Sequence, residues 1–232
     1  WTVLHLPALN DDGTALWPER FSTAELTETK AEIGSRNWEA LYQGRPSPSE
    51  GGLLKREWWK FYREAPTVFD RLLTSWDMTF KETKEGSYVV GQVWGQREAN
   101  YYLLDQMRAR MDFPEAVFAV RALAAKWPAV REHVVEDKAN GPAVIATLRN
   151  KIAGMIPVNP EGGKEARANA VSPMIEAGNV YLPDPLTAPW IHDFIEECAA
   201  FPMGANDDQV DAMSQALVRL RPRRKVTLQW IA

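Results

Sequence analysis

Hydrophobic and polar positions divide this chain of 232 residues into two parts, and the pattern changes near residue 65. In the first part, Pro, Gly and Ser clusters surround one helical pattern that begins at Ser22 or Thr23 and ends near Leu41. Residues 53–63 follow, and their aromatic side chains favour an extended arm packed against a neighbouring domain. The Lys and Arg residues interleaved with those aromatics permit nucleic-acid binding as a weaker alternative.

The pattern becomes regular from Arg71 onward. Runs rich in β-branched and aromatic residues predict antiparallel neighbouring strands at 72–80, 88–94 and 101–107. Helices are then predicted at 114–127, 142–152, 164–176, 189–200 and 206–220, with short strands at 133–136, 155–158 and 180–182. Because such alternation places crossover helices between parallel strands, the sequence predicts an α/β fold with a mixed sheet flanked by helices.

Composition is that of an ordinary globular protein, with 45% apolar and 25% charged residues. No apolar run approaches the roughly 18 residues that span a bilayer. A single cysteine, Cys198, excludes an internal disulfide framework and a Cys-rich zinc site, so we expect a soluble protein of a reducing compartment. The net charge of −4 and the pI near 5.5 argue against a dedicated duplex-binding domain.

Several catalytic signatures are absent from the sequence. It holds no phosphate-binding Gly-x4-Gly-Lys-Ser/Thr loop, no His-Glu-x-x-His and no Gly-x-Ser-x-Gly. Its histidines, His5, His133 and His192, lie far apart and are expected to be packing or surface residues.

Carboxylates instead follow two predicted strands. Asp77 ends the apolar run 72–76, where a charge is costly unless it is paired or bound to metal; the alternative is that Asp77 opens a turn. Glu136 and Asp137 end the run from His133, at the edge of the sheet where α/β proteins place their sites. Because side chains alternate along a strand, at most one of this pair faces a given site. A helix-capping or solvated loop role is their alternative.

A third acidic group opens the last predicted helix, at Asp207, Asp208 and Asp211. Asp208 and Asp211 are three residues apart and share a helix face. Acids after an N-cap at Asn206 also favour the helix dipole, which is the plainer interpretation. Three crowded acids repel one another, however, and a bound cation relieves that repulsion. Oxygen ligands without His or Cys suit two Mg²⁺ or Mn²⁺ ions, which support phosphodiester hydrolysis.

With these acids in place, the chain resembles the C-terminal nuclease part of the large terminase subunit of tailed double-stranded DNA phages and prophages. The motifs that carry this resemblance are Ser75-Trp76-Asp77, Val135-Glu136-Asp137-Lys138-Ala139-Asn140-Gly141, Ala177-Gly178-Asn179-Val180-Tyr181-Leu182-Pro183 and Asp207-Asp208-Gln209-Val210-Asp211-Ala212. Residues 16–21 and 40–46 resemble the segment that joins the ATPase motor to the nuclease. The resemblance spans most of the chain and implies an RNase H-like fold.

The resemblance also implies roles for individual residues. Asp77 would bridge both metals, Glu136 would be the second acid with Asp137 as its competitor, and the last helix would supply Asp208 and Asp211. Asp207 stays possible as a helix ligand. Lys164 and Arg167 are candidates for contacting phosphate, with a solvated helix face as the alternative, and residues 81–86 are expected to form a loop that guides DNA.

By this resemblance, the chain is expected to be a Mg²⁺- or Mn²⁺-dependent endonuclease that cuts double-stranded phage DNA during packaging in the bacterial host cytoplasm. Residues 1–65 would be the linker to an absent ATPase motor, 66–220 the nuclease and 221–232 a basic tail. The expected partners are DNA, the motor, the portal protein and the small terminase subunit, with no membrane. The rival interpretations are a stand-alone resolvase or RNase H, and a non-catalytic module that docks the portal or small subunit.

Overall fold

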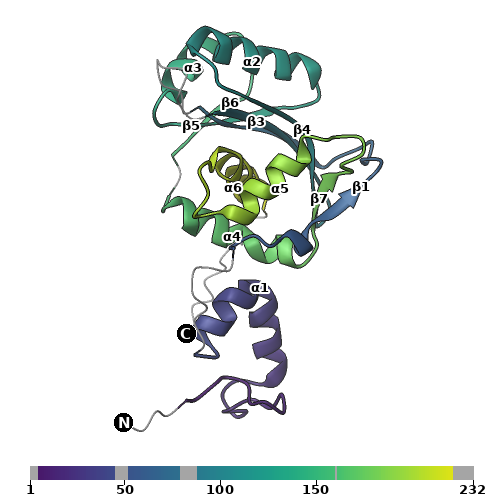
Figure 1. The fold of residues 1–232 in the computed structure, drawn as a ribbon, viewed down its shortest axis with the longest axis vertical. Helices are drawn as coiled ribbons and strands as arrows, with labels where there is room; N and C mark the ends of the chain where they lie inside the picture. Colours follow the sequence, from purple (N-terminus) through teal and green to yellow (C-terminus); the bar gives the residue numbers. More distant parts are fainter. Residues whose placement is uncertain (1–4, 45–51, 79–87, 160, 222–232) are drawn as a thin grey trace, which may run out of the picture.

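A computed structural model describes residues 5–44, 52–78, 88–159 and 161–221. Their strands form one sheet in the order β1-β7-β4-β3-β2-β5-β6 (Figure 1). The strands are β1 (Lys60–Tyr62), β2 (Arg71–Asp77), β3 (Val89–Arg97), β4 (Asn100–Ala109), β5 (Glu132–Glu136), β6 (Met155–Val158) and β7 (Val180–Pro183). β2, β3 and β4 are antiparallel neighbours. β5 runs parallel to β2, and β6 runs parallel to β5.

Helices cover both faces of this sheet. These helices are α2 (Phe113–Lys126), α3 (Gly141–Leu148), α4 (Lys164–Glu176), α5 (Ile191–Ala200) and α6 (Asp208–Leu220). A further helix, α1 (Thr23–Leu41), packs against α4 away from the sheet, and a short 3-10 turn, η1 (Arg56–Trp58), precedes β1 (Figure 1). α2 and α3 lie on one side of the sheet, and α4, α5 and α6 lie on the other (Figure 1). The predicted α/β mixed sheet is therefore confirmed. None of the helices in the described ranges combines the length and apolarity needed to cross a membrane.

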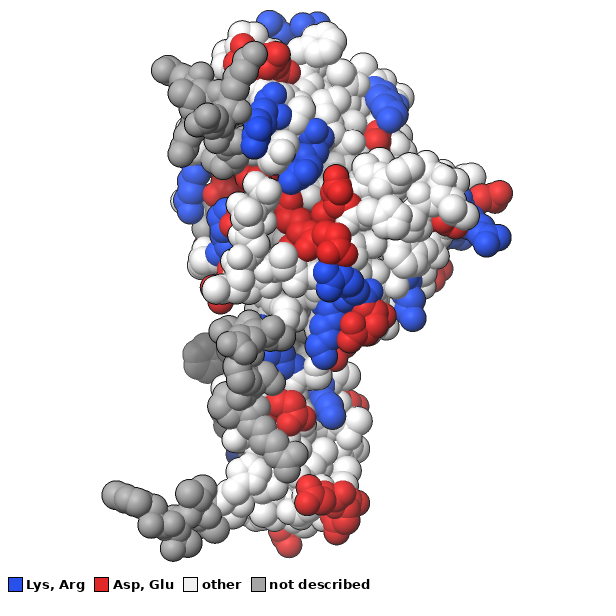
Figure 2. All heavy atoms as spheres, viewed as in Figure 1, with Lys and Arg blue, Asp and Glu red and all other residues white. Residues whose placement is uncertain are grey.

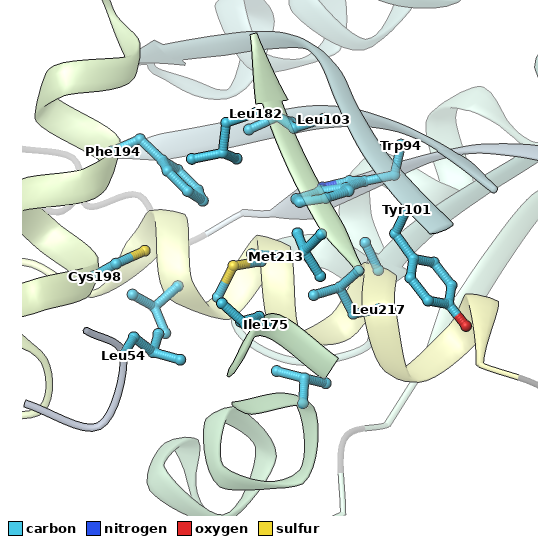
Figure 3. Close-up of a cluster of buried hydrophobic side chains, with 14 of the residues drawn as sticks. Leu54, Trp94, Tyr101, Leu103, Ile175, Leu182, Phe194, Cys198, Met213 and Leu217 are labelled. Atoms are coloured by element: carbon cyan, nitrogen blue, oxygen red, sulfur yellow. The ribbon is translucent and has the colours of Figure 1, made fainter. Parts of the chain in front are cut away.

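Each face of the sheet has its own apolar core. The core under α4, α5 and α6 includes Trp94, Leu103, Phe194, Met213 and Leu217 (Figure 3). The core under α2 and α3 is built around Trp76, Val93 and Val120. The buried Trp76 and Trp94 come from adjacent strands and face opposite cores, so the central strands are apolar on both sides.

The helix predicted from Ser22 is confirmed with a capping box. Glu25 N donates to Ser22 Oγ at 3.3 Å, and Ser22 N donates to Glu25 Oε2 at 2.8 Å. α1 kinks at Gly34, whose φ is +77°, and there meets α4. Ser35 N donates to Glu176 Oε2 at 3.0 Å across this contact.

Residues 53–63, which we expected to form an extended arm, include part of the sheet. β1 pairs in parallel with β7, and the buried Trp59 meets the Phe194 ring edge-on at 5.7 Å. Trp59 thus packs against α5 in the core on one face of the sheet, in line with the prediction that the aromatic side chains of this segment are packed. The boundary near residue 65 remains a prediction.

Several predicted element ends are wrong. The helix predicted to reach 152 ends at Leu148, because the chain must turn at Gly154, with φ of +80°, to enter β6. A Cβ at Gly154 would lie 2.0 Å from the carbonyl oxygen of Arg131. The last helix begins at Asp208 with Asp207 as its N-cap, in place of Asn206. The first strand ends at Asp77, while the predicted DNA-guiding loop at 81–86 and the basic tail after Arg221 lie outside the described residues.

Candidate functional site

Two neighbouring parallel strands bring the first acids together. Trp76 of β2 is paired in register with Val135 of β5, so Asp77 and Glu136 occupy equivalent positions at the carboxyl ends. Asp77 is buried and Glu136 is half-buried, whereas Asp137 is exposed beyond the strand end. The two neighbouring acids therefore differ in burial, as expected if their side chains point to opposite faces of the sheet. Asp77 is the last residue of a buried strand, and Met78 after it is also buried.

Gly141 allows the next helix to begin close to Glu136. A Cβ on Gly141 would lie 1.8 Å from the backbone carbonyl oxygen of Glu136, so no larger residue fits without moving the chain. α3 begins at this glycine. The Asn140-Gly141-Pro142 turn thus fixes where β5 stops and which backbone surrounds Glu136.

The last helix is tied to the same strand ends. Gln215 Nε2 donates to Ser75 Oγ at 2.9 Å and to the Trp76 carbonyl oxygen at 3.3 Å, which holds α6 against β2. Near the start of α6, Gln92 Nε2 of β3 donates to the Gln209 carbonyl oxygen at 3.1 Å. The first turn of α6, with Asp208 and Asp211, is therefore anchored to the sheet that carries Asp77.

The environment of Asp208 disfavours the ionised form of its carboxyl group. Asp208 is only 4% exposed, and its Oδ2 accepts a 3.3 Å hydrogen bond from Tyr88 N. Burial, together with the nearby carboxylates of Glu197 and Asp207, raises the pKa of Asp208 from 3.8 to about 6, against the opposing effect of the Tyr88 hydrogen bond. An acid held this way gains from a nearby cation.

Asp207 and Asp211 differ from Asp208, since both are paired with cations from α4. Lys164 Nζ lies 2.6 Å from Asp207 Oδ1 and 2.7 Å from Asp211 Oδ2, and an Arg167 terminal nitrogen lies 2.7 Å from Asp211 Oδ1. Burial opposes the charge on Lys164, but the two aspartates outweigh it and raise the pKa of Lys164 above its usual range. The two residues that we predicted to contact phosphate thus face the acids of α6.

Acidic and basic side chains border one another on this side of the protein. Figure 2 shows Asp and Glu gathered near the middle of the main body, with Lys and Arg above and below them. In the described part of the chain, no three or more His, Cys, Asp or Glu side chains are already arranged to hold a metal ion. In this conformation Asp211 is held in ion pairs with Lys164 and Arg167.

The sequence analysis missed a buried carboxylate beside these acids, Glu197 of α5. Its Oε1 accepts from Gln209 N at 2.7 Å, and its Oε2 accepts from Gln209 Nε2 at 2.7 Å and lies 2.9 Å from an Arg108 terminal nitrogen. A signal was present, because Glu197 falls on the same helix side as the buried Phe194 and Cys198. A charged residue in an apolar stripe calls for a partner.

His133 and Cys198 are packing residues. His133 is buried against Thr74, with Nδ1 and Oγ1 2.9 Å apart, and burial lowers the pKa of its imidazole. Cys198 is buried as well, and burial raises the pKa of its thiol, which disfavours the reactive thiolate.

Comparison with known proteins gives one family. A family model described as "Terminase RNaseH-like domain" matches residues 74–220. The large terminase of a thermophilic bacteriophage superposes with a TM-score of 0.64 at 11% identity, over 87% of this chain and 53% of that one. The large terminase nuclease of another thermophilic phage, G20c, with bound magnesium gives a TM-score of 0.54 at 14% identity, over 74% of this chain and 99% of that one. Its zinc-bound form gives 0.55 at 14% identity, over 72% and 96%.

The chain spans about half the length of the first of these large terminases, and it matches the whole length of the G20c nuclease over three quarters of its own. Among curated protein sequences, none matches the chain. The identities show a shared fold alone, whereas the family model covers all the strands and helices from β3 to α6 together with most of β2. The chain therefore belongs to the terminase RNase H-like domain family.

Proposed function

We propose that this chain is a metal-dependent endonuclease domain that hydrolyses double-stranded DNA during phage genome packaging. The observation that carries the proposal is the arrangement of the elements that bear the acids: Asp77 and Glu136 end neighbouring parallel strands in register, and Gln215 ties α6, which begins at Asp208, to the end of β2. Membership of the terminase RNase H-like family supports it, as do the magnesium- and zinc-bound structures of the G20c nuclease.

The donor set fits hard divalent cations. Asp77, Glu136 and Asp208 would hold the metal through carboxylate oxygens, and the buried, charge-crowded Asp208 has the most to gain from it. Two bound Mg²⁺ or Mn²⁺ ions would supply an activated water and charge stabilisation at the scissile phosphate. The chain's own residues hold the acids in place, through the strand register of β2 with β5 and through Gln215.

Asp211 would join this set only after releasing Lys164. In the described conformation, Lys164 and Arg167 occupy both of its oxygens. We propose that Lys164, whose side chain is 47% exposed, turns to a DNA phosphate when metal neutralises the acids. Arg167 is only 11% exposed, so it more readily stays with Asp211 and orients it. Asp137 stays the weaker candidate for the second acid because it is exposed past the strand end.

The proposal extends to a larger assembly. We propose that residues 1–65, whose β1 strand joins the edge of the sheet, link this domain to an ATPase motor, that 66–220 form the rest of the nuclease, and that residues 221–232 are a basic tail. DNA, the motor, the portal protein and the small terminase subunit are the proposed partners, in the cytoplasm of the bacterial host. The similarity to about half of a bacteriophage large terminase supports this arrangement.

The test is a cleavage assay on three substrates of equal molarity: supercoiled plasmid, a four-way junction and an RNA–DNA hybrid. We expect Mn²⁺-dependent nicking and linearisation of the plasmid that EDTA abolishes. Preferential cutting of the junction or the hybrid would instead identify a resolvase or an RNase H. No cleavage of any substrate, from pH 6 to 9 with Mg²⁺ or Mn²⁺, would favour a docking module.

A further inference from the structure

The first turn of α6 takes its cap from a different helix. The side chain of its N-cap residue, Asp207, makes no capping hydrogen bond among the described residues and bonds Lys164 instead. Glu197 of α5 supplies the acceptor, because its Oε1 receives the Gln209 N–H at 2.7 Å. A carboxylate at this position satisfies a backbone donor and also favours the positive end of the helix dipole.

Glu197 is itself held firmly. Its side chain is 6% exposed and pairs with Arg108 of β4 at 2.9 Å, while the Arg108 guanidinium lies 3.9 Å from the centre of the Tyr88 ring. Gln209, fully buried, donates its amide to Glu197 and accepts from Gln106 Nε2 at 2.8 Å. The start of α6 is thus fixed from α5 and from the sheet at the same time.

These contacts converge on Asp208. Gln209, whose backbone and side chain both bond Glu197, is the next residue along the chain. Tyr88 N donates to Asp208, and the Tyr88 ring stacks on the arginine that Glu197 pairs with. Glu197 therefore reaches the Asp208 backbone through Gln209, and it reaches the Asp208 carboxylate through Arg108 and Tyr88.

We propose that Glu197 is a positioning residue of the metal site: through Gln209 and Arg108 it holds the Asp208 carboxylate in the orientation that binds the cation. This inference rests on the function proposed above. Its competitor is that Glu197 only stabilises the packing of α5 on α6. Replacing a residue that orients a metal ligand through hydrogen bonds typically changes the metal affinity 10–100-fold.

The protein provides a matched control at the other end of the same helix. Glu132 pairs with Arg71 at 2.7 Å and with Arg219, in the last turn of α6, at 2.8 Å. Glu132 thus resembles Glu197 in chemistry and in its partner helix, but it lies at the opposite end from Asp208.

The experiment compares Glu197→Ala, Glu197→Gln and Glu132→Ala by calorimetric titration with Mn²⁺ and by plasmid cleavage across Mn²⁺ concentrations. For Glu197→Ala we expect a Mn²⁺ dissociation constant raised roughly 10–100-fold, and a cleavage rate that excess Mn²⁺ largely restores. Glu197→Gln keeps an acceptor for the Gln209 N–H and should fall between this variant and wild type. Glu132→Ala should lose thermal stability without changing Mn²⁺ affinity.

Equal Mn²⁺ affinity in wild type and both Glu197 variants would overturn the inference, whatever happens to the melting temperature. If Glu197→Ala fails to fold, Glu197→Gln carries the same test. A wild type that binds Mn²⁺ without cutting DNA would overturn the proposed function and leave the positioning role measurable. A wild type that neither binds Mn²⁺ nor cuts would overturn both.

Discussion

Two aspartates one turn apart on α6 have opposite electrostatic surroundings. Asp211 is paired with Lys164 and Arg167, whereas Asp208 faces further carboxylates and has its pKa raised to about 6 by burial and by Glu197 and Asp207. The charge of Asp211 is neutralised by the protein's own cations. The charge of Asp208 would be stabilised by a bound cation. This contrast is the reason that we propose Asp208 as the metal-binding acid of the helix.

Replacing Asp208 with Asn should stabilise the metal-free protein at neutral pH while removing cleavage. The folded state keeps the Asp208 proton up to about pH 6, whereas the unfolded chain releases it near 3.8. The group's stabilising contribution is therefore full below about pH 4 and lost as the pH rises through 6. We expect Asp208→Asn to gain on the order of 2 kcal/mol in urea unfolding at pH 7, and little at pH 4.

The control for this measurement is Asp193→Asn, an exposed acid in the first turn of α5. Because the Asp193 side chain is exposed, its exchange for Asn should leave the unfolding free energy at pH 7 close to that of wild type. A destabilised Asp208→Asn protein at pH 7 without metal would contradict the electrostatic interpretation of this residue.

Glu136 and Asp137 should differ sharply when each is changed to its amide. The half-buried Glu136 ends β5 beside Asp77, and the exposed Asp137 lies beyond it. Loss of a metal ligand removes several kcal/mol of charge stabilisation, so Glu136→Gln should slow plasmid cleavage about 100-fold or more. Asp137→Asn should stay near the wild-type rate, and the reverse order would assign the ligand to Asp137.

At the scale of elements, the site depends on how closely β2 and β3 pack. Gly91 pairs with Trp76, and a Cβ at Gly91 would lie 2.3 Å from the buried Trp76 ring. Trp76 directly precedes Asp77, and its carbonyl oxygen accepts from Gln215 of α6. The glycine therefore sets the position of the strand end that carries the first acid.

Gly91→Ala should consequently lower both stability and cleavage. Overpacking of this kind costs about 1–3 kcal/mol, because the Trp76 ring must leave its position. Gly163→Ala is the matched control, since a Cβ there has no neighbour within 4 Å, and it should cost less than about 1 kcal/mol as an N-cap change. Equal unfolding free energies for the two variants in denaturant titrations would show that Trp76 moves aside without cost.

Sequence patterns predicted the fold because the elements have strong local signals. The apolar run of β2, the capping residue Ser22 and the glycine after α4 each mark an element in the printed sequence. The candidate acids Asp77 and Glu136 were singled out because they end predicted strands, and Asp208 because it opens the last helix. Glu197 and its partner Arg108 were missed, since 89 positions separate the two residues and only the folded sheet brings them together.

The ion pairs of α4 show the same limit of local information. Lys164 and Arg167 were predicted to contact phosphate from their place on a helix after two glycines. The structure places them against Asp207 and Asp211, which follow more than forty residues later. Sequence spacing predicts which residues share a helix face. Their interaction partners depend on how α4 packs on α6 in the folded protein.

For the whole molecule, the net charge of −4 no longer argues against a DNA substrate. Part of the acidic excess is gathered at one site, next to cations that already pair with it. Divalent ions reverse the local sign of such a site. We therefore expect DNA binding by this chain to be weak without metal and to strengthen when Mn²⁺ is present.

Plasmid cleavage by Asp77→Asn, measured beside wild type at saturating Mn²⁺, tests the central claim most directly. Asp77 ends the central strand of the site, and its exchange for Asn preserves size while removing the charge. The account predicts Mn²⁺-dependent conversion of supercoiled DNA by the wild type and no conversion above the metal-free background by the variant. A folded Asp77→Asn protein that cuts at the wild-type rate would contradict it.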